Sequence, residues 1–238
     1  MTLLALENVS KTYYRGGRHR LPVLRDVSLH VDAGELAAIV ADPAAGKTTL
    51  LRIAAGLEPP DTGTVRLAGR SLPAGNDLDP RIALVTRTSP PRETTGLPVT
   101  DFVGLALMDR MPTREARQRT DAALDAFDLR TLASSTWPEL SDVERTLIRI
   151  AQAVVRRPML LLLDDPVLGL GISTTETVLS QIREAARAHA TATLMTVGHL
   201  SEALHADTML TLNAGALMEM SRQPARGQVL DFPTGRVS

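Results

Sequence analysis

A short apolar strand followed by a loop that ends in Gly46-Lys47-Thr48 constrains the fold of this chain more than any other feature. Leu36–Val40 is a continuous apolar run, typical of a strand buried on both faces, and Lys47–Gly56 has helical spacing that ends at a glycine. Backbone N–H groups at the start of such a helix point towards an anion, while a lysine reaches terminal phosphates and a threonine hydroxyl can hold Mg²⁺. We predict a phosphate-binding loop here; the alternative is a surface loop in which these three residues coincide by chance.

This loop departs from the usual pattern G-x-x-x-x-G-K-T. Ala41 stands where the first glycine is expected, and a methyl group there is tolerable unless the position needs positive φ. Asp42 adds a carboxylate near the expected phosphate, which weakens anion binding unless the side chain points away. The predicted nucleotide-binding residues of the loop are Ala41, Asp42, Pro43, Ala44, Ala45, Gly46, Lys47, Thr48 and Thr49.

Lysine usage supports the phosphate-binding loop. Lys11 and Lys47 are the only lysines among 26 basic residues, and Lys47 falls where a compact ammonium group matters. The absence of cysteine excludes disulfides and thiolate metal sites, and a net charge of −1 provides no electrostatic drive towards nucleic acid. Aliphatic runs such as Met159–Leu163 are too short to span a membrane, and Met1–Ser10 lacks the basic start of a signal peptide. We therefore expect a cytoplasmic protein that neither binds nucleic acid nor inserts into a membrane.

The order of predicted elements indicates an α/β protein with a helical insertion. The predicted strands are Leu3–Tyr14, Val23–Val31, Leu36–Val40, Thr64–Leu67, Ile82–Val85, Met159–Leu163, Thr193–Val197 and Met209–Leu212. After the helix at Lys47, helical spacing covers Thr100–Leu132, Ser141–Val155, Ser173–His189 and a turn at Ser201–His205, while Arg15–Arg20 is predicted as a turn and Thr88–Pro98 as a loop. We expect a core over residues 1–87 and 159–221, a helical subdomain over 88–158 and a C-terminal tail over 222–238.

Further motifs lie in order around the phosphate-binding loop. They are Ser10-Lys11-Thr12-Tyr13, Leu24–Leu29 with Gly34-Glu35, Gly56-Leu57 with Thr62-Gly63, Leu160–Pro166, and Glu202-Ala203 with Ala206-Asp207. With these motifs the chain resembles the nucleotide-binding subunit of an ABC transporter, over almost all of its length before the tail. The basic segment before Leu24 is similar to the lipoprotein-release and macrolide-export branch of that family.

The resemblance implies the family's fold and its ligands. The expected fold is a P-loop NTPase core with an N-terminal antiparallel β subdomain and an inserted helical subdomain. The expected cofactors are ATP and Mg²⁺, with Tyr13 stacking on adenine and with Thr48 and Asp164 holding the metal. The alternative for Asp164 is a carboxylate in a turn at the end of a strand.

Two positions that the family uses for hydrolysis carry other residues. Asp165 occupies the place of the glutamate that positions the attacking water, and its side chain is one methylene shorter, which displaces a base by about 1.5 Å. Its alternative role is to cap the turn that follows. Arg87 aligns with the glutamine that senses the terminal phosphate and Mg²⁺, and a guanidinium has donors only, so it cannot bind a metal. A solvated arginine at the strand end is the alternative interpretation.

The start of the helix at Ser141 differs from the family's signature LSGGQ. In the family this helix start faces the phosphate that the other subunit binds. Ser141 is retained as a candidate nucleotide contact, whereas Asp142 and Val143 replace the two glycines with bulk and a negative charge. Ser141 and Glu144 have the spacing of a capping box. We therefore expect the helix to persist while its contact with phosphate is lost.

The switch histidine of the family aligns with Gly198, one residue before His199. A loop slipped by one residue would bring His199 into place; otherwise its side chain points to the other side of the strand end. The aspartate that follows the Walker B turn in the family aligns with Gly171. The candidate catalytic residues are thus Asp165 and His199.

Together these positions predict an ATP-binding subunit of an ABC transporter with slow or absent hydrolysis. In the family, two subunits sandwich two nucleotides, and the expected partners are a second ATP-binding subunit, identical or different, and a membrane permease. The permease is expected to contact Thr88–Pro98 and the helices after it, and would hold the chain at the inner face of the cell membrane. The alternatives are a subunit that hydrolyses ATP despite these changes, and a regulatory or structural docking subunit without nucleotide turnover.

Overall fold

A six-stranded sheet forms the centre of the computed structural model, in which the described residues are 1–15, 19–86, 96–108 and 110–220. The strand order is β10-β9-β3-β8-β7-β6. The parallel strands are β3 (Leu36–Val40), β6 (Ile82–Val85), β7 (Leu160–Asp164), β8 (Ala192–Val197) and β9 (Thr208–Asn213). At the edge, β10 (Ala216–Met220) pairs antiparallel with β9.

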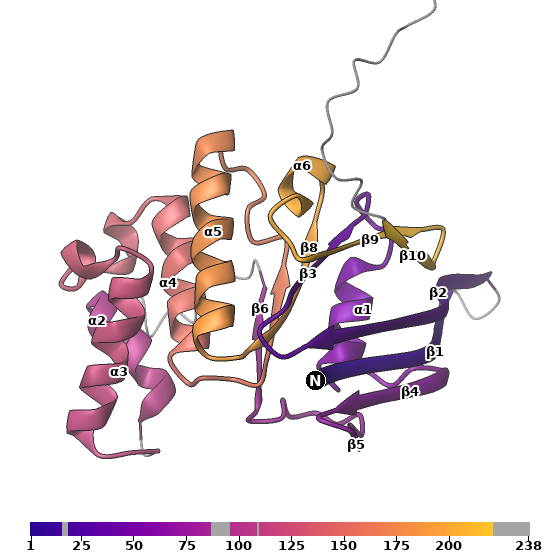
Figure 1. Ribbon diagram of the computed structural model, residues 1–238, viewed down its shortest axis with the longest axis horizontal. Coiled ribbons are helices and arrows are strands. Elements are labelled where there is room, and N and C mark those ends of the chain that lie inside the picture. Colours follow the sequence, from indigo (N-terminus) through magenta and orange to yellow (C-terminus); the bar gives the residue numbers. More distant parts are fainter. Residues whose placement is uncertain (16–18, 87–95, 109, 221–238) are drawn as a thin grey trace, which may run out of the picture.

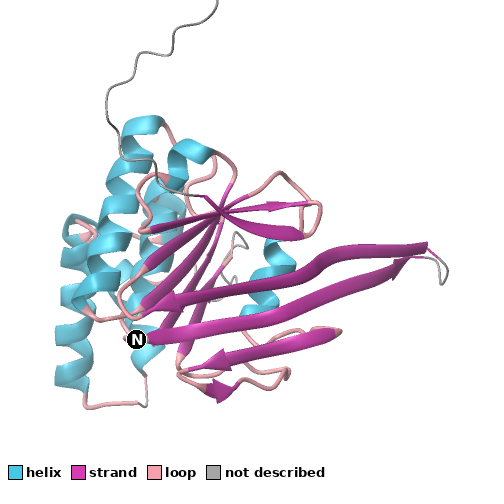
Figure 2. Ribbon diagram, turned by 45° about the vertical axis from the view of Figure 1, so that its right-hand side comes forward, coloured by secondary structure: helices cyan, strands magenta, loops and turns pink. Residues whose placement is uncertain are grey.

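A second sheet, antiparallel throughout, contains the N-terminal strands. Its order is β2-β1-β4-β5, with β1 (Thr2–Arg15), β2 (His19–Asp32), β4 (Thr62–Leu67) and β5 (Arg70–Ser71). The hairpin of β1 and β2 is long (Figure 2), and its pairing continues to Arg15 opposite His19. The prediction of a turn over Arg15–Arg20 is therefore wrong at its described ends, because cross-strand hydrogen bonds extend both strands; residues 16–18 lie outside the described part.

Both faces of the parallel sheet are covered (Figure 1). Helix α1 (Lys47–Ala54) lies between the two sheets, where Leu50, Leu51 and Ile53 are buried against them. Helices α4 (Asp142–Val154) and α5 (Ile172–Ala188) cover the opposite face. Successive leucines of β7 alternate between these two cores, which explains its uninterrupted apolar run. The short helix α6 (Leu200–Ala203) follows β8.

The helices inserted between β6 and β7 form a separate layer beside α5 (Figure 1). They are α2 (Val99–Gly104), α3 (Thr113–Ala126) and α4, with single 3₁₀ turns at Leu105–Leu107, Arg130–Leu132 and Trp137–Glu139. The helical spacing predicted over Thr100–Leu132 is thus interrupted, and α3 starts directly after Pro112, since proline is disfavoured inside a helix. These observations confirm the predicted fold class. The exact boundaries at residues 88 and 158 stay a prediction. Arg87, residues 88–95 of the predicted loop and the predicted tail lie outside the described residues.

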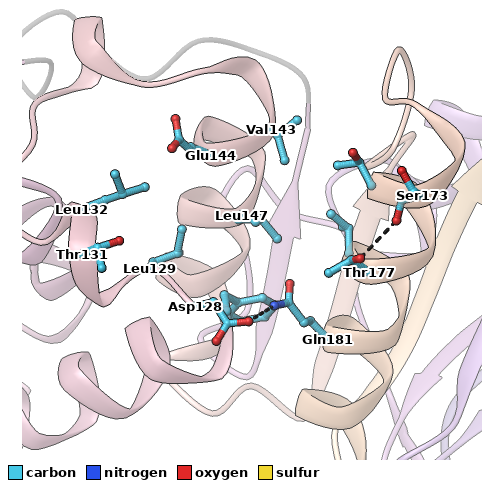
Figure 3. A pocket seen from close by; sticks show the side chains of 13 residues that line it. Asp128, Leu129, Thr131, Leu132, Val143, Glu144, Leu147, Ser173, Thr177 and Gln181 are labelled. Carbon is cyan, nitrogen blue, oxygen red and sulfur yellow. Dashed lines mark hydrogen bonds between the residues drawn. The ribbon is translucent and has the colours of Figure 1, made fainter.

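The inserted layer and α5 are linked by a polar contact at the edge of a pocket (Figure 3). Gln181 Nε2 of α5 donates to Asp128 Oδ2, which follows α3, at 2.9 Å. The pocket above this contact has a volume of ≈ 430 Å³ and is lined on one side by α4, through Val143 and Leu147, and on the other by α5, through Thr177. The inserted helices and α5 are therefore joined by this hydrogen bond at one end of the pocket, and the pocket separates α4 from α5 above it.

Two strands were not predicted, the two-residue strand β5 and the edge strand β10. The edge strand β10 follows a two-residue turn, Ala214-Gly215, in which both residues have positive φ, of 48° and 82°. Such a turn matches the twist of a hairpin and is signalled by a glycine after a small or polar residue. None of the helices in the described ranges combines the length and the apolar composition that crossing a membrane requires.

Candidate nucleotide-binding site

The phosphate-binding loop connects β3 to α1 and has a backbone that only glycine fits at its end. Gly46 has φ of 104°, and a Cβ atom built there would lie 2.7 Å from Val23 Cγ1. The helix N-terminus that follows points backbone N–H groups into the loop. Ala44 also has positive φ, of 65°. The backbone strain that a side-chain methyl group causes at positive φ was considered for Ala41. It concerns Ala44 instead, because Ala41 does not have positive φ.

The first residue of the loop is buried, whereas the three residues after it are exposed. Ala41 is buried, and its N–H donates to Val197 O at 3.2 Å, which fixes the loop to β8. The N–H of Ala45 donates to Asp42 O at 3.2 Å and closes the turn. Asp42, Pro43 and Ala44 are exposed. The Asp42 carboxylate therefore lies at the surface.

Lys47 is the buried cation of the site. Its side chain retains only 9% exposure, its Nζ donates to Ala41 O at 3.0 Å, and the same atom lies 3.1 Å from Asp165 Oδ1. Asp165 Oδ1 is buried and accepts no hydrogen bond from a described residue, so its charge is balanced by the ion pair alone. The ammonium group of the loop and the carboxylate at the end of β7 are thus in direct contact, across 118 residues of chain.

A chain of hydroxyl and carboxylate groups continues this contact along the ends of β7 and β8. Thr48 Oγ1 donates to Asp164 Oδ2 at 2.8 Å, and Thr196 Oγ1 donates to Asp164 Oδ1 at 3.0 Å. The N–H of Asp165 donates to Thr196 Oγ1 at 3.1 Å. Thr196 is fully buried and was missed by sequence reasoning, although a hydroxyl on the apolar strand beside Asp164 could have indicated it.

The arrangement of Thr48 and Asp164 fits a Mg²⁺ site of the type that phosphate substrates complete. Mg²⁺ takes one or two protein oxygens and keeps waters and phosphate oxygens for the rest of its octahedron. Among the described residues no three His, Cys, Asp or Glu side chains gather as a metal-binding group, so a protein-only metal cage is not formed by that part of the chain. The hydroxyl and carboxylate that touch at the helix start are the two ligands that such a site needs.

Tyr13 lies beside the loop at the end of the β1 hairpin. Its hydroxyl donates to Glu58 and lies 3.4 Å from Thr49 Oγ1, and its side chain is partly exposed. Burial, followed by the hydrogen bond to the Glu58 carboxylate, raises the pKa of Tyr13. Lys11 stacks on the Tyr13 ring, with Nζ 5.6 Å from its centroid, and donates to Pro59 O at 2.7 Å. Lys11 therefore fixes Tyr13, whereas Lys47 enters the loop.

The start of α4 satisfies its own polar groups. The N–H and the hydroxyl of Ser141 both donate to Glu144 Oε2 at 2.7 Å, and the N–H of Glu144 donates to Ser141 Oγ at 3.3 Å. These bonds, the backbone bond first, lower the pKa of Glu144. The predicted capping box is therefore present. Asp142 is 93% exposed, and it places its charge at the surface of the helix start.

His199 lies just beyond the end of β8, at the start of α6. Its side chain is exposed, and its N–H donates to Glu202 Oε2 at 3.0 Å, as does the N–H of Gly198. Gly171 directly precedes α5. The structure thus brings Lys47, Thr48, Asp164 and Asp165 into one network, places Tyr13 and Thr49 at its edge, and leaves Ser141 and His199 outside it. Arg87 lies outside the described residues.

Known proteins are similar to this chain over most of its length. Residues 24–168 match the family model described as "ABC transporter". The chain is 32% identical over 227 residues to the lipoprotein-releasing system ATP-binding protein LolD of Maricaulis maris (strain MCS10), covering 90% of this chain and 96% of the relative. It is 31% identical over 242 residues to the Fe(3+) ions import ATP-binding protein FbpC of Pseudomonas fluorescens, covering 98% of this chain and 66% of the relative. The similarity to a lipoprotein-release subunit agrees with the prediction from the basic segment before Leu24.

Solved structures share the fold. A dimeric ATP-binding cassette in a post-hydrolysis state, bound to ADP and phosphate, matches with a TM-score of 0.77 at 23% identity, covering 93% of this chain and 100% of the other. This likeness confirms the two-sheet core with inserted helices. Together, the matching family model and the relatives that align over most of the chain identify it as a member of the ABC transporter family, an ATP-binding subunit.

Proposed function

We propose that this chain binds Mg-ATP at the phosphate-binding loop, couples it to a membrane permease, and hydrolyses it slowly or not at all. One observation carries the proposal: Lys47 and Thr48 of the loop contact Asp165 and Asp164 directly, at 3.1 Å and 2.8 Å. These contacts assemble the groups that hold phosphate and metal. They also occupy, through Lys47, the carboxylate that would have to act as a base.

The residues of the loop and of the end of β7 support nucleotide binding. Lys47, the N–H groups at the start of α1 and the loop backbone would hold the phosphates, and Tyr13 would stack on the base. Thr48 and Asp164 would hold Mg²⁺, which would neutralise phosphate charge when bound. Thr196 fixes the orientation of the Asp164 carboxylate by a hydrogen bond to its second oxygen.

Weak turnover follows from the geometry of Asp165. A general base must reach the proton that it abstracts within about 3 Å. The Asp165 carboxylate is short, its backbone has φ of 48°, and its Oδ1 atom lies against Lys47. Misplacement by about 1 Å costs on the order of a hundredfold in rate.

The second subunit would meet the start of α4. There, the Ser141 hydroxyl and N–H already bond to Glu144, and Asp142 presents a negative charge at the surface. An anion held by the other subunit would meet this charge instead of the free N–H groups of two glycines. A dimer, with an identical or a different chain, would therefore have weakened contacts at the sites that this helix completes.

The permease would dock on the inserted helices. A pocket of ≈ 460 Å³ lies between α2 and α3, with Leu97, Leu105 and Met108 on its apolar wall. Met108 is 61% exposed, and a large exposed apolar side chain beside a groove is typical of a protein interface. A short amphipathic helix of the permease fits such a groove. This contact would hold the chain at the inner face of the membrane.

A turnover measurement tests the proposal. Wild-type protein with its permease should hydrolyse ATP slowly, and the triple variant Asp165→Glu, Asp142→Gly, Val143→Gly should be faster by about a hundredfold, since a well-placed general base contributes 10²–10⁴. A matched control, Asp42→Gly, changes an exposed carboxylate of the loop and should not produce this gain. Wild-type turnover at least as fast as that of the triple variant, and lost in Lys47→Ala, would contradict weakened hydrolysis.

A non-hydrolysing regulatory subunit is the second candidate. The Lys47–Asp165 ion pair favours it, because this contact engages both charged groups of the hydrolytic step at once. In this case the triple variant would stay inactive, while Mg-ATP would still bind and change the conformation or the stability of the permease complex.

A further inference from the structure

A polar cavity of ≈ 300 Å³ lies between the end of β7 and a partly exposed face of α4. One wall carries Asp164 and Asp165. These are the same carboxylates that contact Thr48 and Lys47, at 2.8 Å and 3.1 Å. The cavity therefore adjoins the phosphate-binding loop, on the far side of its two acidic residues.

The opposite wall carries two arginines on one face of α4. Arg145 and Arg149 are one helical turn apart, and their Cζ atoms lie 5.9 Å and 5.3 Å from the centroid of the Trp137 ring. The Arg145 Nε donates to Trp137 O at 3.3 Å, and the Arg149 Nη1 donates to Thr86 O at 3.1 Å. The indole ring and these bonds hold both guanidinium groups in place.

The charges of the cavity are not evenly paired. Asp142 Oδ1 lies 3.2 Å from Arg145, Asp165 pairs with Lys47, and Asp164 accepts from two hydroxyl groups. Of the arginines that line the cavity, Arg149 alone has no carboxylate within 4.0 Å among the described residues.

Because Arg149 is partly buried and lies near Arg145, its charge is destabilised when no described carboxylate pairs with it. Burial, followed by repulsion from Arg145, lowers the pKa of Arg149, yet a guanidinium stays charged at neutral pH. A partly buried cation beside a like charge is stabilised when an anion enters.

We propose that Arg149 binds a phosphate group in this cavity: the terminal phosphate of the nucleotide, or the inorganic phosphate that separates from it. The proposal rests on nucleotide binding at the adjoining loop, as proposed above. A guanidinium offers two parallel N–H donors to two phosphate oxygens, and only one of its five donors is committed to a described residue, Thr86. Arg145, held by Asp142 and Trp137, keeps Arg149 in position by sharing the indole ring.

The two sources of phosphate are distinguishable by their probes. The ATP analogue AMP-PNP carries the terminal phosphate, Mg-ADP lacks it, and inorganic phosphate added to the Mg-ADP complex represents the separated group. Each is titrated into wild-type protein and into Arg149→Gln, whose amide can donate hydrogen bonds but has no charge. Arg149→Lys, which keeps the charge and loses the fork, is the conservative variant.

Arg156→Gln is the matched control. Arg156 is also partly buried, donates to a backbone carbonyl, Pro80 O, at 2.9 Å, and has its pKa lowered by burial, but it does not line the cavity. It therefore reports the cost of losing a similar arginine elsewhere. Thermal unfolding of all variants separates a structural loss from a loss of phosphate binding.

The expected result is that Arg149→Gln lowers the affinity for AMP-PNP, or for phosphate on the Mg-ADP complex, by ten- to a hundredfold, about the value of one charge-assisted hydrogen bond. The affinity for Mg-ADP should stay within about twofold, Arg149→Lys should recover part of the loss, and Arg156→Gln should match wild type. Equal losses for Mg-ADP and AMP-PNP, or no loss for either source of phosphate, would overturn the proposal. Absence of Mg-ADP and AMP-PNP binding in wild type would overturn nucleotide binding itself, and with it this role of Arg149.

Discussion

The phosphate-binding loop and the start of α4 are both helix N-termini, and they treat their polar groups in opposite ways. At the loop, the buried Lys47 and the exposed Thr48 reach across to another strand, and the helix start has no side-chain cap. At α4, Ser141 and Glu144 bond to one another within one turn. The first N-terminus leaves N–H groups open to an anion, whereas the second supplies its own carboxylate.

Under the proposed function, this difference would explain how one half of a nucleotide site persists while the other half diverges. The capping box stabilises α4 locally, and it does not involve the side chains of Asp142, which is exposed, or Val143, which is partly buried against the core. The loop has no such freedom, since its lysine and hydroxyl belong to a network that also holds β7 to β8. Substitutions at the loop should therefore lower both the free energy of unfolding and the affinity for nucleotide, whereas substitutions at the start of α4 should have small effects on stability.

Gly46→Ala should have the largest effect. The new Cβ would lie 2.7 Å from Val23 Cγ1 at a φ of 104°, and strain together with overpacking costs about 2–4 kcal/mol. The free energy of unfolding in urea should fall by this amount, and Mg-ATP binding should be lost. Gly69→Ala is the control, because Gly69 also has positive φ, of 75°, but nothing within 4 Å of its Cβ. It should cost about 1 kcal/mol and keep binding; equal costs for both variants would refute the steric argument.

Thr196→Val should have the next largest effect. It removes the hydroxyl that donates to Asp164 and accepts from the Asp165 N–H, and leaving buried groups unpaired costs about 1–3 kcal/mol. Thr193→Val, on the same strand, is an informative partner because the Thr193 hydroxyl is buried and has no hydrogen bond with a described residue. Urea unfolding should show Thr193→Val as stable as wild type or more so. A Thr196→Val protein of wild-type stability would show that the network contributes nothing to the fold.

Glu144→Gln at the start of α4 should have the smallest effect, about 0.5–1 kcal/mol at pH 7. The Ser141 bonds lower the pKa of Glu144 below its ordinary 4.5, so its charge stabilises the folded state above that pH. This contribution is lost as the pH falls through the folded-state pKa. Unfolding measured at pH 7 and near pH 3 should therefore show the difference between wild type and variant shrinking on acidification. Glu176→Gln, an exposed carboxylate on α5, should show no such change; a difference that grows at low pH would contradict the sign of the pKa shift.

The fold was predictable from sequence where a local pattern carries the structure. The apolar runs of β3 and β7 and the capping-box spacing of Ser141 and Glu144 are such patterns, and the structure contains all of them. The edge strand β10 was not predicted, because a five-residue strand after a short turn has too few residues to show an alternation. The extension of β2 back to His19 depends on pairing with β1, which no local pattern reports.

The candidate site was predictable in its residues but not in its contacts. The motif at Lys47 and the carboxylates at the end of β7 stand out in the chain, yet their ion pair joins residues far apart in sequence. Thr196 and Arg149 acquire their roles only from neighbouring elements, since a threonine in a strand and an arginine in a helix have no distinctive spacing. Long-range pairing of this kind requires the folded structure.

Titration of the protein with Mg-ATP tests the central claim most directly, with Lys47→Ala and Lys11→Ala measured beside wild type. Lys11 pairs with Glu58 and Asp61 outside the loop, so its loss controls for the removal of a partly buried lysine. We predict saturable, Mg²⁺-dependent binding by wild type, a loss of at least about tenfold in Lys47→Ala, and a much smaller loss in Lys11→Ala. Absence of binding in wild type, or equal affinity in wild type and a folded Lys47→Ala, would contradict nucleotide binding at this loop.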